Sequence, residues 1–185
     1  MKLYVFIFLL GLSVSAQLMA SAAAAGDAPA YMQADHIVIW PKQLNENNLA
    51  ALNQKKSITI YFANEMEPNL KTKFLLLAQL PHPRLFIELV NVKTLKYELE
   101  HLTQLGNVVG LVLAKCNITD KQIDSIRKIK TLEKLNLKGN PAITDAELKK
   151  LYDLRKLTEF NAEDTGISKE ALNDFYMNRI LSNRK

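Results

Sequence analysis

Few residues in this chain of 185 amino acids are of the types that carry out catalysis or bind metals. The single cysteine, Cys116, could be a nucleophile or a redox thiol, and His36, His82 and His101 could be metal ligands. A redox thiol needs a second cysteine and a nucleophilic thiol needs a base, yet no histidine lies close to Cys116 in sequence. The histidines lack the spacing of a metal motif such as H-E-x-x-H. We therefore expect a buried structural role for Cys116, and no catalytic, metal-binding or cofactor-binding residues.

The carboxylates, glycines and overall charge indicate no other chemistry. Glu65 with Glu67 and Glu98 with Glu100 alternate within polar stretches, which is typical of a solvated face. The glycines are scattered, so no phosphate-binding loop is expected. The formal net charge of +5 is spread along the chain, unlike the clustered basic stripe of a protein that binds nucleic acid. We expect a protein that is not an enzyme and has no nucleic-acid partner.

Residues 1–25 have the composition of a secretory signal peptide. Lys2 precedes an uncharged apolar run from Leu3 to Ala16, and small residues follow it. The run is shorter than the ~20 residues that a helix needs to span a bilayer. The alternative is an uncleaved anchor. Three cleavage sites fit the pattern equally well, after Ala16, Ala22 or Ala25.

The rest of the chain is long enough for one domain with a buried core. We expect residues 26–35 to form an N-terminal cap or linker and residues 36–185 to form the domain. With one cysteine, no intramolecular disulfide can form, so the core must supply the stability. The expected location is periplasmic or extracellular, without stable membrane insertion once the signal peptide is removed.

A repeated phrase organises the second half of the chain. Ile-Thr-Asp begins at Ile118 and again at Ile143, an interval of 25 residues, and fixed periods of this size indicate stacked repeats. Three aligned segments begin at Val108, Leu132 and Leu157. Each opens with alternating apolar residues, which predict a short strand, and continues with the three- or four-residue spacing of a helix. The strand pairs are Leu111 and Leu113, Leu135 and Leu137, and Phe160 and Ala162.

The repeated phrase has the chemistry of a helix start. Thr119 with Gln122, and Thr144 with Glu147, have the spacing of a capping box. Ser168 occupies the same place in the third segment. The aspartate after each threonine would lie near the positive end of the helix dipole. These aspartates therefore need no catalytic role.

The three segments follow the pattern L-x-x-L-x-L-x-x-[N/C/T]-x-[I/L] and resemble the leucine-rich repeat family over residues 108–181. Cys116, Asn140 and Thr165 fill the position that this family commonly gives to Asn, Cys or Thr. Lengths of 24 to 25 residues with a helix in each look like the cysteine-containing or ribonuclease-inhibitor-like subtypes. The resemblance implies an α/β fold, a right-handed solenoid with a parallel sheet on its concave face.

Upstream the same pattern is less regular. Strand pairs are expected at Ile37 and Ile39, at Ile58 and Ile60, and at Ile87 and Leu89, with Asn45 as a helix cap. We therefore expect about six strand-loop-helix units, beginning near residues 34, 57, 83, 108, 132 and 157. Such stacks need about three units to bury a continuous core.

In a stack of this kind, the strand residues between the inward apolar pairs line the concave face. The first four units would present aromatic and aliphatic side chains there, and the last two would present charged and amide side chains. We expect Trp40, Tyr61 and Phe86 to form one exposed patch; the alternative is that residues 27–35 cover Trp40. The predicted partner-binding residues are Trp40, Tyr61, Phe86, Glu88, Val112, Asn136, Lys138 and Asn161.

These residues predict an exported, monomeric, non-enzymatic module that binds a protein partner through its concave face. Tyr and Trp are typical anchors of protein interfaces. The alternative is a structural or envelope-associated protein that binds polysaccharide or peptidoglycan, which amides around Asn136 and Asn161 would favour.

Export predicts proteolytic processing. Protein purified from the exported fraction should begin between Gln17 and Asp27, because every candidate cleavage site lies in that interval. Intact-mass measurement or N-terminal sequencing would locate the new terminus. An exported protein that retains Met1 would contradict the signal peptide.

Overall fold

The computed structural model describes residues 35–63, 70–92, 95 and 98–182. They belong to one compact unit, Asp35–Lys185. The expected signal peptide, the expected cap or linker before Asp35, and the pair Glu65 and Glu67 lie outside these residues. Within the described ranges, every helix is too short or too polar to span a membrane.

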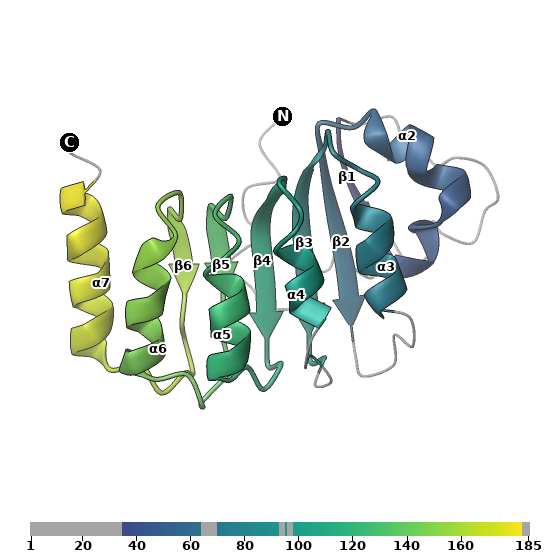
Figure 1. The fold of residues 1–185 in the computed structure, drawn as a ribbon. Helices are drawn as coiled ribbons and strands as arrows, with labels where there is room; N and C mark the ends of the chain where they lie inside the picture. Colours follow the sequence, from purple (N-terminus) through teal and green to yellow (C-terminus); the bar gives the residue numbers. More distant parts are fainter. Residues whose placement is uncertain (1–34, 64–69, 93–94, 96–97, 183–185) are drawn as a thin grey trace. The chain divides into compact units, whose positions relative to one another are not determined.

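The described strands form a single parallel sheet of six strands, ordered as they occur in the chain. Each strand therefore pairs with the strand of the preceding and following unit (Figure 1). This confirms the α/β class and the six expected strands. The strands are β1 (His36–Ile39), β2 (Ser57–Ala63), β3 (Arg84–Val90), β4 (Val108–Ala114), β5 (Lys134–Asn136) and β6 (Glu159–Asn161).

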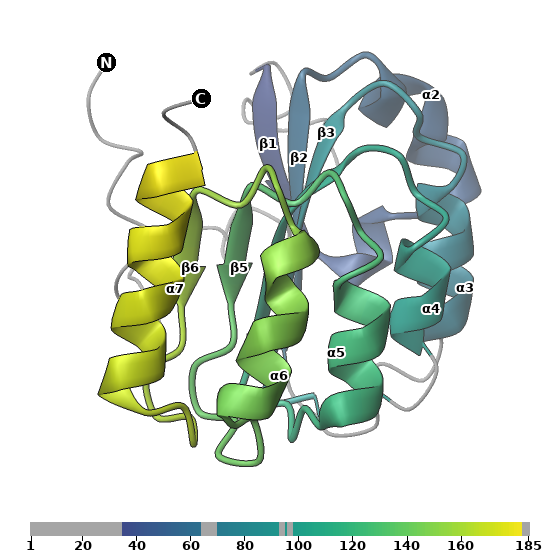
Figure 2. The same ribbon diagram turned by 60° about the vertical axis from the view of Figure 1, so that its left-hand side comes forward.

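The helices connect successive strands and lie on one face of the sheet, where α5, α6 and α7 stand side by side (Figure 2). The α-helices are α2 (Leu49–Asn53), α3 (Leu70–Leu77), α4 (Glu98–Leu102), α5 (Asp120–Ile126), α6 (Asp145–Lys150) and α7 (Lys169–Ser182). Short 3-10 helices are η2 (Pro41–Gln43), η3 (Glu46–Asn48) and η4 (Leu151–Asp153).

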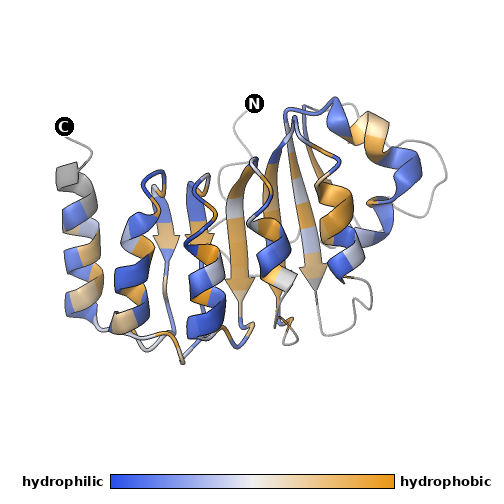
Figure 3. Ribbon diagram, viewed as in Figure 1, coloured by the Kyte–Doolittle hydropathy of each residue, from blue (hydrophilic) through white to orange (hydrophobic). Residues whose placement is uncertain are grey.

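The core lies between the sheet and this helix layer. Strands β3 and β4 are largely hydrophobic, whereas α5 and α6 turn mostly hydrophilic residues toward the viewer (Figure 3). On β3 burial alternates, with Leu85, Ile87 and Leu89 fully buried. The predicted inward residues of the other strands are buried too, except that Phe160 is half-buried. Alternating apolar residues thus identified the core side of each strand.

The predicted helix starts are confirmed. Thr144 donates from its backbone N–H (2.9 Å) and from its hydroxyl (2.6 Å) to the Glu147 carboxylate, and this contact lowers the pKa of Glu147. Thr119 makes the same two contacts with Gln122. Ser168 Oγ accepts from the N–H of Ala171 at 3.1 Å. These side chains satisfy amides that the first helical turn leaves unpaired.

A left-handed residue follows each of four successive strands. Asn91, Lys115, Gly139 and Asp164 have φ between 55° and 73° and are 24 or 25 residues apart. The N–H of Lys115 donates to Lys138 O, and the N–H of Gly139 donates to Glu163 O, both at 2.9 Å. Each turn is therefore bonded to the corresponding position of the next unit.

Asn140 joins two units from within the core, where it is fully buried. Its side-chain oxygen accepts from the N–H groups of Cys116 and Ile118, each at 3.0 Å. Its amide nitrogen donates to Leu113 O and Leu137 O, each at 2.7 Å. Because an unpaired buried polar group costs about 1–3 kcal/mol, this set of bonds fixes the loop after β5 against the loop after β4.

The two residues aligned with Asn140 also bond to strand-end carbonyls. The Cys116 thiol donates to Leu89 O at 3.3 Å, and the Thr165 hydroxyl donates to Ala162 O at 2.7 Å. Cys116 is buried, as expected. The shared position therefore holds a side chain that satisfies backbone groups where the chain leaves the sheet.

The turns predict opposite effects for two substitutions. Lys115→Gly should raise the free energy of unfolding by up to about 1 kcal/mol, because the left-handed region costs a residue with a Cβ about 1–2 kcal/mol and glycine is freer when unfolded. Gly139→Ala should lower it by about 1 kcal/mol or more, since a Cβ there would lie 2.7 Å from Lys115 Cγ. Urea denaturation measures both. Changes of the same sign in the two variants would contradict this account of the turns.

Candidate functional site

The helix-free face is the side of the sheet opposite the helix layer, formed by the strand residues that alternate with the core residues. The strand register aligns five of the predicted site residues across β2 to β6. This central row consists of Tyr61, Glu88, Val112, Asn136 and Asn161. Trp40 follows Ile39, whose partner is Ile60, and so extends the row beyond β2. Most of the predicted site therefore lies along one line of the sheet.

Two aromatic rings stand at one end of the central row. Trp40 and Tyr61 pack edge to face, with ring centroids 5.0 Å apart and planes at 85°. Both are half-buried rather than exposed. Burial raises the pKa of Tyr61, and the neighbouring Glu88 carboxylate raises it further. Edge-to-face pairs prefer this spacing, so each ring helps to fix the other.

Phe86 does not lie in the central row, and the prediction that it aligns with Tyr61 is wrong. The interval from Tyr61 to Phe86 is 25 residues, which matches the later period, but β2 and β3 pair with an offset of 27, so Tyr61 faces Glu88. The half-buried Phe86 ring instead contacts His36 edge to face at 6.0 Å. The Arg84 guanidinium lies 5.9 Å from its centroid.

Gly110 makes room for the Phe86 ring. A Cβ built on Gly110 would lie 2.3 Å from Phe86 Cδ1, which is far inside van der Waals contact. The two residues are direct partners across β3 and β4. The Phe86 ring therefore packs on β4 at Gly110. It lies between the central row and the N-terminal ends of the strands.

Glu88 is the acidic residue in the part of the central row that runs from Trp40 to Val112. It is half-buried, and burial raises the pKa of its carboxyl. Tyr61 is its partner on β2 and Val112 its partner on β4. Among the described residues, no lysine, arginine or histidine forms an ion pair with it.

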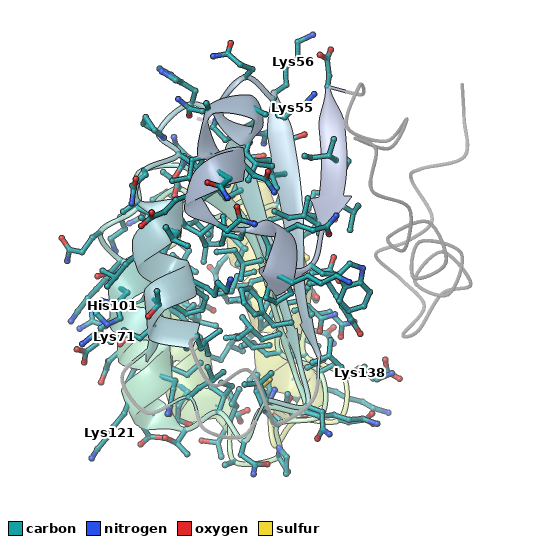
Figure 4. The ribbon with its side chains drawn as sticks, turned by 90° about the vertical axis from the view of Figure 1, so that its right-hand side faces the viewer. Lys55, Lys56, Lys71, His101, Lys121 and Lys138 are labelled. Atoms are coloured by element: carbon teal, nitrogen blue, oxygen red, sulfur yellow. The ribbon has the colours of Figure 1, made fainter. Side chains whose placement is uncertain are left out.

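The other half of the face carries cross-strand ion pairs. Lys138, on the opposite side of the sheet from Lys71, His101 and Lys121 (Figure 4), contacts Glu163 at 2.7 Å. The Glu163 carboxylate raises the pKa of Lys138. Lys134 contacts Glu159 at 2.6 Å in the same half, and Arg84 on β3 contacts Glu133, the residue before β5, at 2.5 Å. Exposed pairs add at most about 1 kcal/mol each, so their main effect is to neutralise the surface.

The two asparagines of the central row are used by the backbone. Asn136 Oδ1 accepts from the N–H of Lys138, and Asn161 Oδ1 accepts from the N–H of Glu163, both at 2.9 Å. Such bonds close a turn at the residue after each strand. The side-chain oxygens that could have accepted from a ligand's hydroxyl groups are therefore already engaged.

Sequence reasoning missed a polar cluster at the start of β1 and β2. His36 Nδ1 lies 2.6 Å from Ser57 Oγ, and its Nε2 lies 3.5 Å from Thr59 Oγ1. Partial burial lowers the pKa of His36. A serine beside an imidazole resembles a nucleophile with its base, but here both ring nitrogens face hydroxyls and no described carboxylate orients the ring. Only the 21-residue offset between β1 and β2 could have revealed this pair.

No protein-family model matches the chain, and no curated protein matches it either. Across the residues that the structure describes, no group of three His, Cys, Asp or Glu side chains could hold a metal ion.

The buried environment of Cys116 predicts that its thiol reacts slowly with alkylating reagents. Burial raises the pKa of Cys116 from an ordinary 9.0 to about 11. At pH 8 the folded protein should therefore hold on the order of a hundredfold less thiolate than the unfolded chain, and thiolate is the reactive form. Alkylation by iodoacetamide, followed by mass spectrometry with and without urea, should show at least this difference. Equal rates in both conditions would contradict a buried structural role.

Proposed function

We propose that the chain is an exported solenoid of leucine-rich-repeat-like units that binds a protein partner through the helix-free face of its sheet. The parallel sheet in chain order, the recurring left-handed turns and the shared position of Cys116, Asn140 and Thr165 support the repeat architecture. The apolar N-terminal stretch supports export.

The observation that carries the proposal is the composition of the central row near β1 to β4. Tyr61 and the buried Val112 are the strand partners of Glu88, Trp40 packs against Tyr61, and all four residues occupy positions that alternate with the core residues. Interface centres are enriched in aromatic residues and poor in charge, whereas rims are polar. The part of the face toward β1 to β4, which carries the aromatic residues, therefore resembles the centre of an interface. The part toward β5 and β6, which carries the ion pairs, resembles its rim.

A protein fits this face better than a polysaccharide. Glycan recognition requires amide and carboxylate groups that are free to bond with hydroxyls. Asn136 and Asn161 use their oxygens within the chain, and Glu159 and Glu163 are paired with lysines. The asparagine oxygens and these two carboxylates therefore already have partners within the chain.

Affinity capture with matched variants tests the proposal. The mature protein, Tyr61→Ala and Lys128→Ala would each be immobilised and exposed to envelope and medium fractions of the source cells. Lys128 is an exposed residue that follows α5, on the helix side. A protein partner should bind the native chain and Lys128→Ala equally, and Tyr61→Ala at least about tenfold more weakly, because truncated anchors cost about 2 kcal/mol or more.

Circular dichroism must show that Tyr61→Ala remains folded, since the ring is half-buried. A partner that binds all three chains equally would refute recognition by this face. Capture of polysaccharide instead of protein would refute the proposed partner class.

A further inference from the structure

The acidic residues on the helix-free face differ in one respect. Glu133, Glu159 and Glu163 each contact a cation of the same chain, namely Arg84, Lys134 and Lys138. Glu88 is half-buried and has no such partner among the described residues, whereas Glu159 and Glu163 are exposed. A half-buried carboxylate that has no cation beside it lacks the opposite charge that would offset the cost of its desolvation.

The groups around Glu88 suit a visiting cation. On one side Tyr61 is its direct strand partner, and Trp40 packs against Tyr61 with centroids 5.0 Å apart. On the other side Val112 forms an apolar wall that is itself only 8% exposed. Aromatic rings attract ammonium and guanidinium groups, most strongly where water is partly excluded. A lysine or arginine side chain could place its methylenes on these walls and its charge on the carboxylate.

Among the described residues, no cation of this face forms an ion pair with Glu88. The other titratable residues facing the same side on neighbouring strands are Tyr61 on β2, His36 on β1 and Arg84 on β3 itself. Arg84 lies four residues before Glu88 and contacts Glu133, and His36 contacts Ser57 and Phe86. The Phe86 ring, laid over Gly110, stands between that cluster and the central row.

We propose that Glu88, with Tyr61 beside it and Trp40 packed against Tyr61, is the receptor for a lysine or arginine side chain of the protein partner. This inference rests on the proposed function and names the chemistry of its partner. Glu88 supplies the charge, the two rings supply the cation–π contact, and Val112 shapes the opposite wall. On binding, the partner's cation forms an ion pair with Glu88. Glu133, Glu159 and Glu163 already have such ion pairs within the chain.

The proposal predicts that Glu88 destabilises the free protein. Its folded-state pKa is raised from an ordinary 4.5, so the protonated form is favoured on folding and stability is lost as pH rises through the folded pKa. Glu88→Gln should therefore raise the thermal midpoint at pH 7 by about 2 °C or more, and the gain should shrink toward pH 4. Glu163→Gln, which removes an acid that already has a lysine, should give no gain at pH 7.

Binding of a defined probe tests the receptor directly. The probe is a blocked pentapeptide with lysine between two leucines, and its control carries norleucine, which lacks the charge. Titration followed by NMR at pH 7 should show the lysine peptide bound at least about tenfold more tightly than the control by the native protein. Arginine should act like lysine. Glu88→Gln should abolish the preference, and Glu163→Gln should retain it.

Equal affinity of the native protein for the lysine and norleucine peptides would overturn the proposal, as would a preference that survives in Glu88→Gln. The failure is separable from failure of the proposed function. A captured partner that loses affinity for Tyr61→Ala but binds Glu88→Gln as well as the native chain would leave face recognition in place and refute the cation receptor alone.

Discussion

The repeat from β3 to β6 depends on the backbone turn that follows each of these four strands. A left-handed residue, from Asn91 through Lys115 and Gly139 to Asp164, reverses the chain and bonds to the same position of the next unit. Inside the turn, the buried Asn140 bonds to backbone groups on both sides. These bonds set how far each strand is shifted against its neighbour, and that shift decides which side chains share a row on the helix-free face.

Features with a local cause could be predicted from the sequence. The capping pairs of Thr119 and Thr144 and the inward residues of every strand follow from spacing within one unit. The sequence could not predict which outward residues share a row, because this depends on the offset between paired strands. The offset is 21 residues from His36 to Ser57 but 27 from Ser57 to Arg84. The expectation that Trp40, Tyr61 and Phe86 form one patch failed at this offset, because Tyr61 pairs with Glu88. Glu88 is among the predicted partner-binding residues, but its lack of a cation among the described residues is visible only once its neighbours are known.

Charged groups are distributed unevenly over the helix-free face. Toward β6, cations and acids neutralise one another across strands, as in Lys134 with Glu159. Toward β1, Glu88 lies between its strand partners Tyr61 and Val112, Trp40 packs against Tyr61, and burial raises the pKa of the Glu88 carboxyl. We expect a carboxylate in this setting to lower the stability of the free protein, and residues that oppose stability are characteristic of sites that serve binding. This contrast links the fold to the proposed recognition of a cationic side chain.

The most direct test of this account is the pKa of the Glu88 side chain, measured by carbon NMR titration of the carboxyl group. In the free protein it should lie above the ordinary value of 4.5, because ionisation is opposed by burial. With the lysine peptide bound it should fall, because a cation stabilises the ionised form. An ordinary value in the free protein that does not change when the peptide is added would contradict the account.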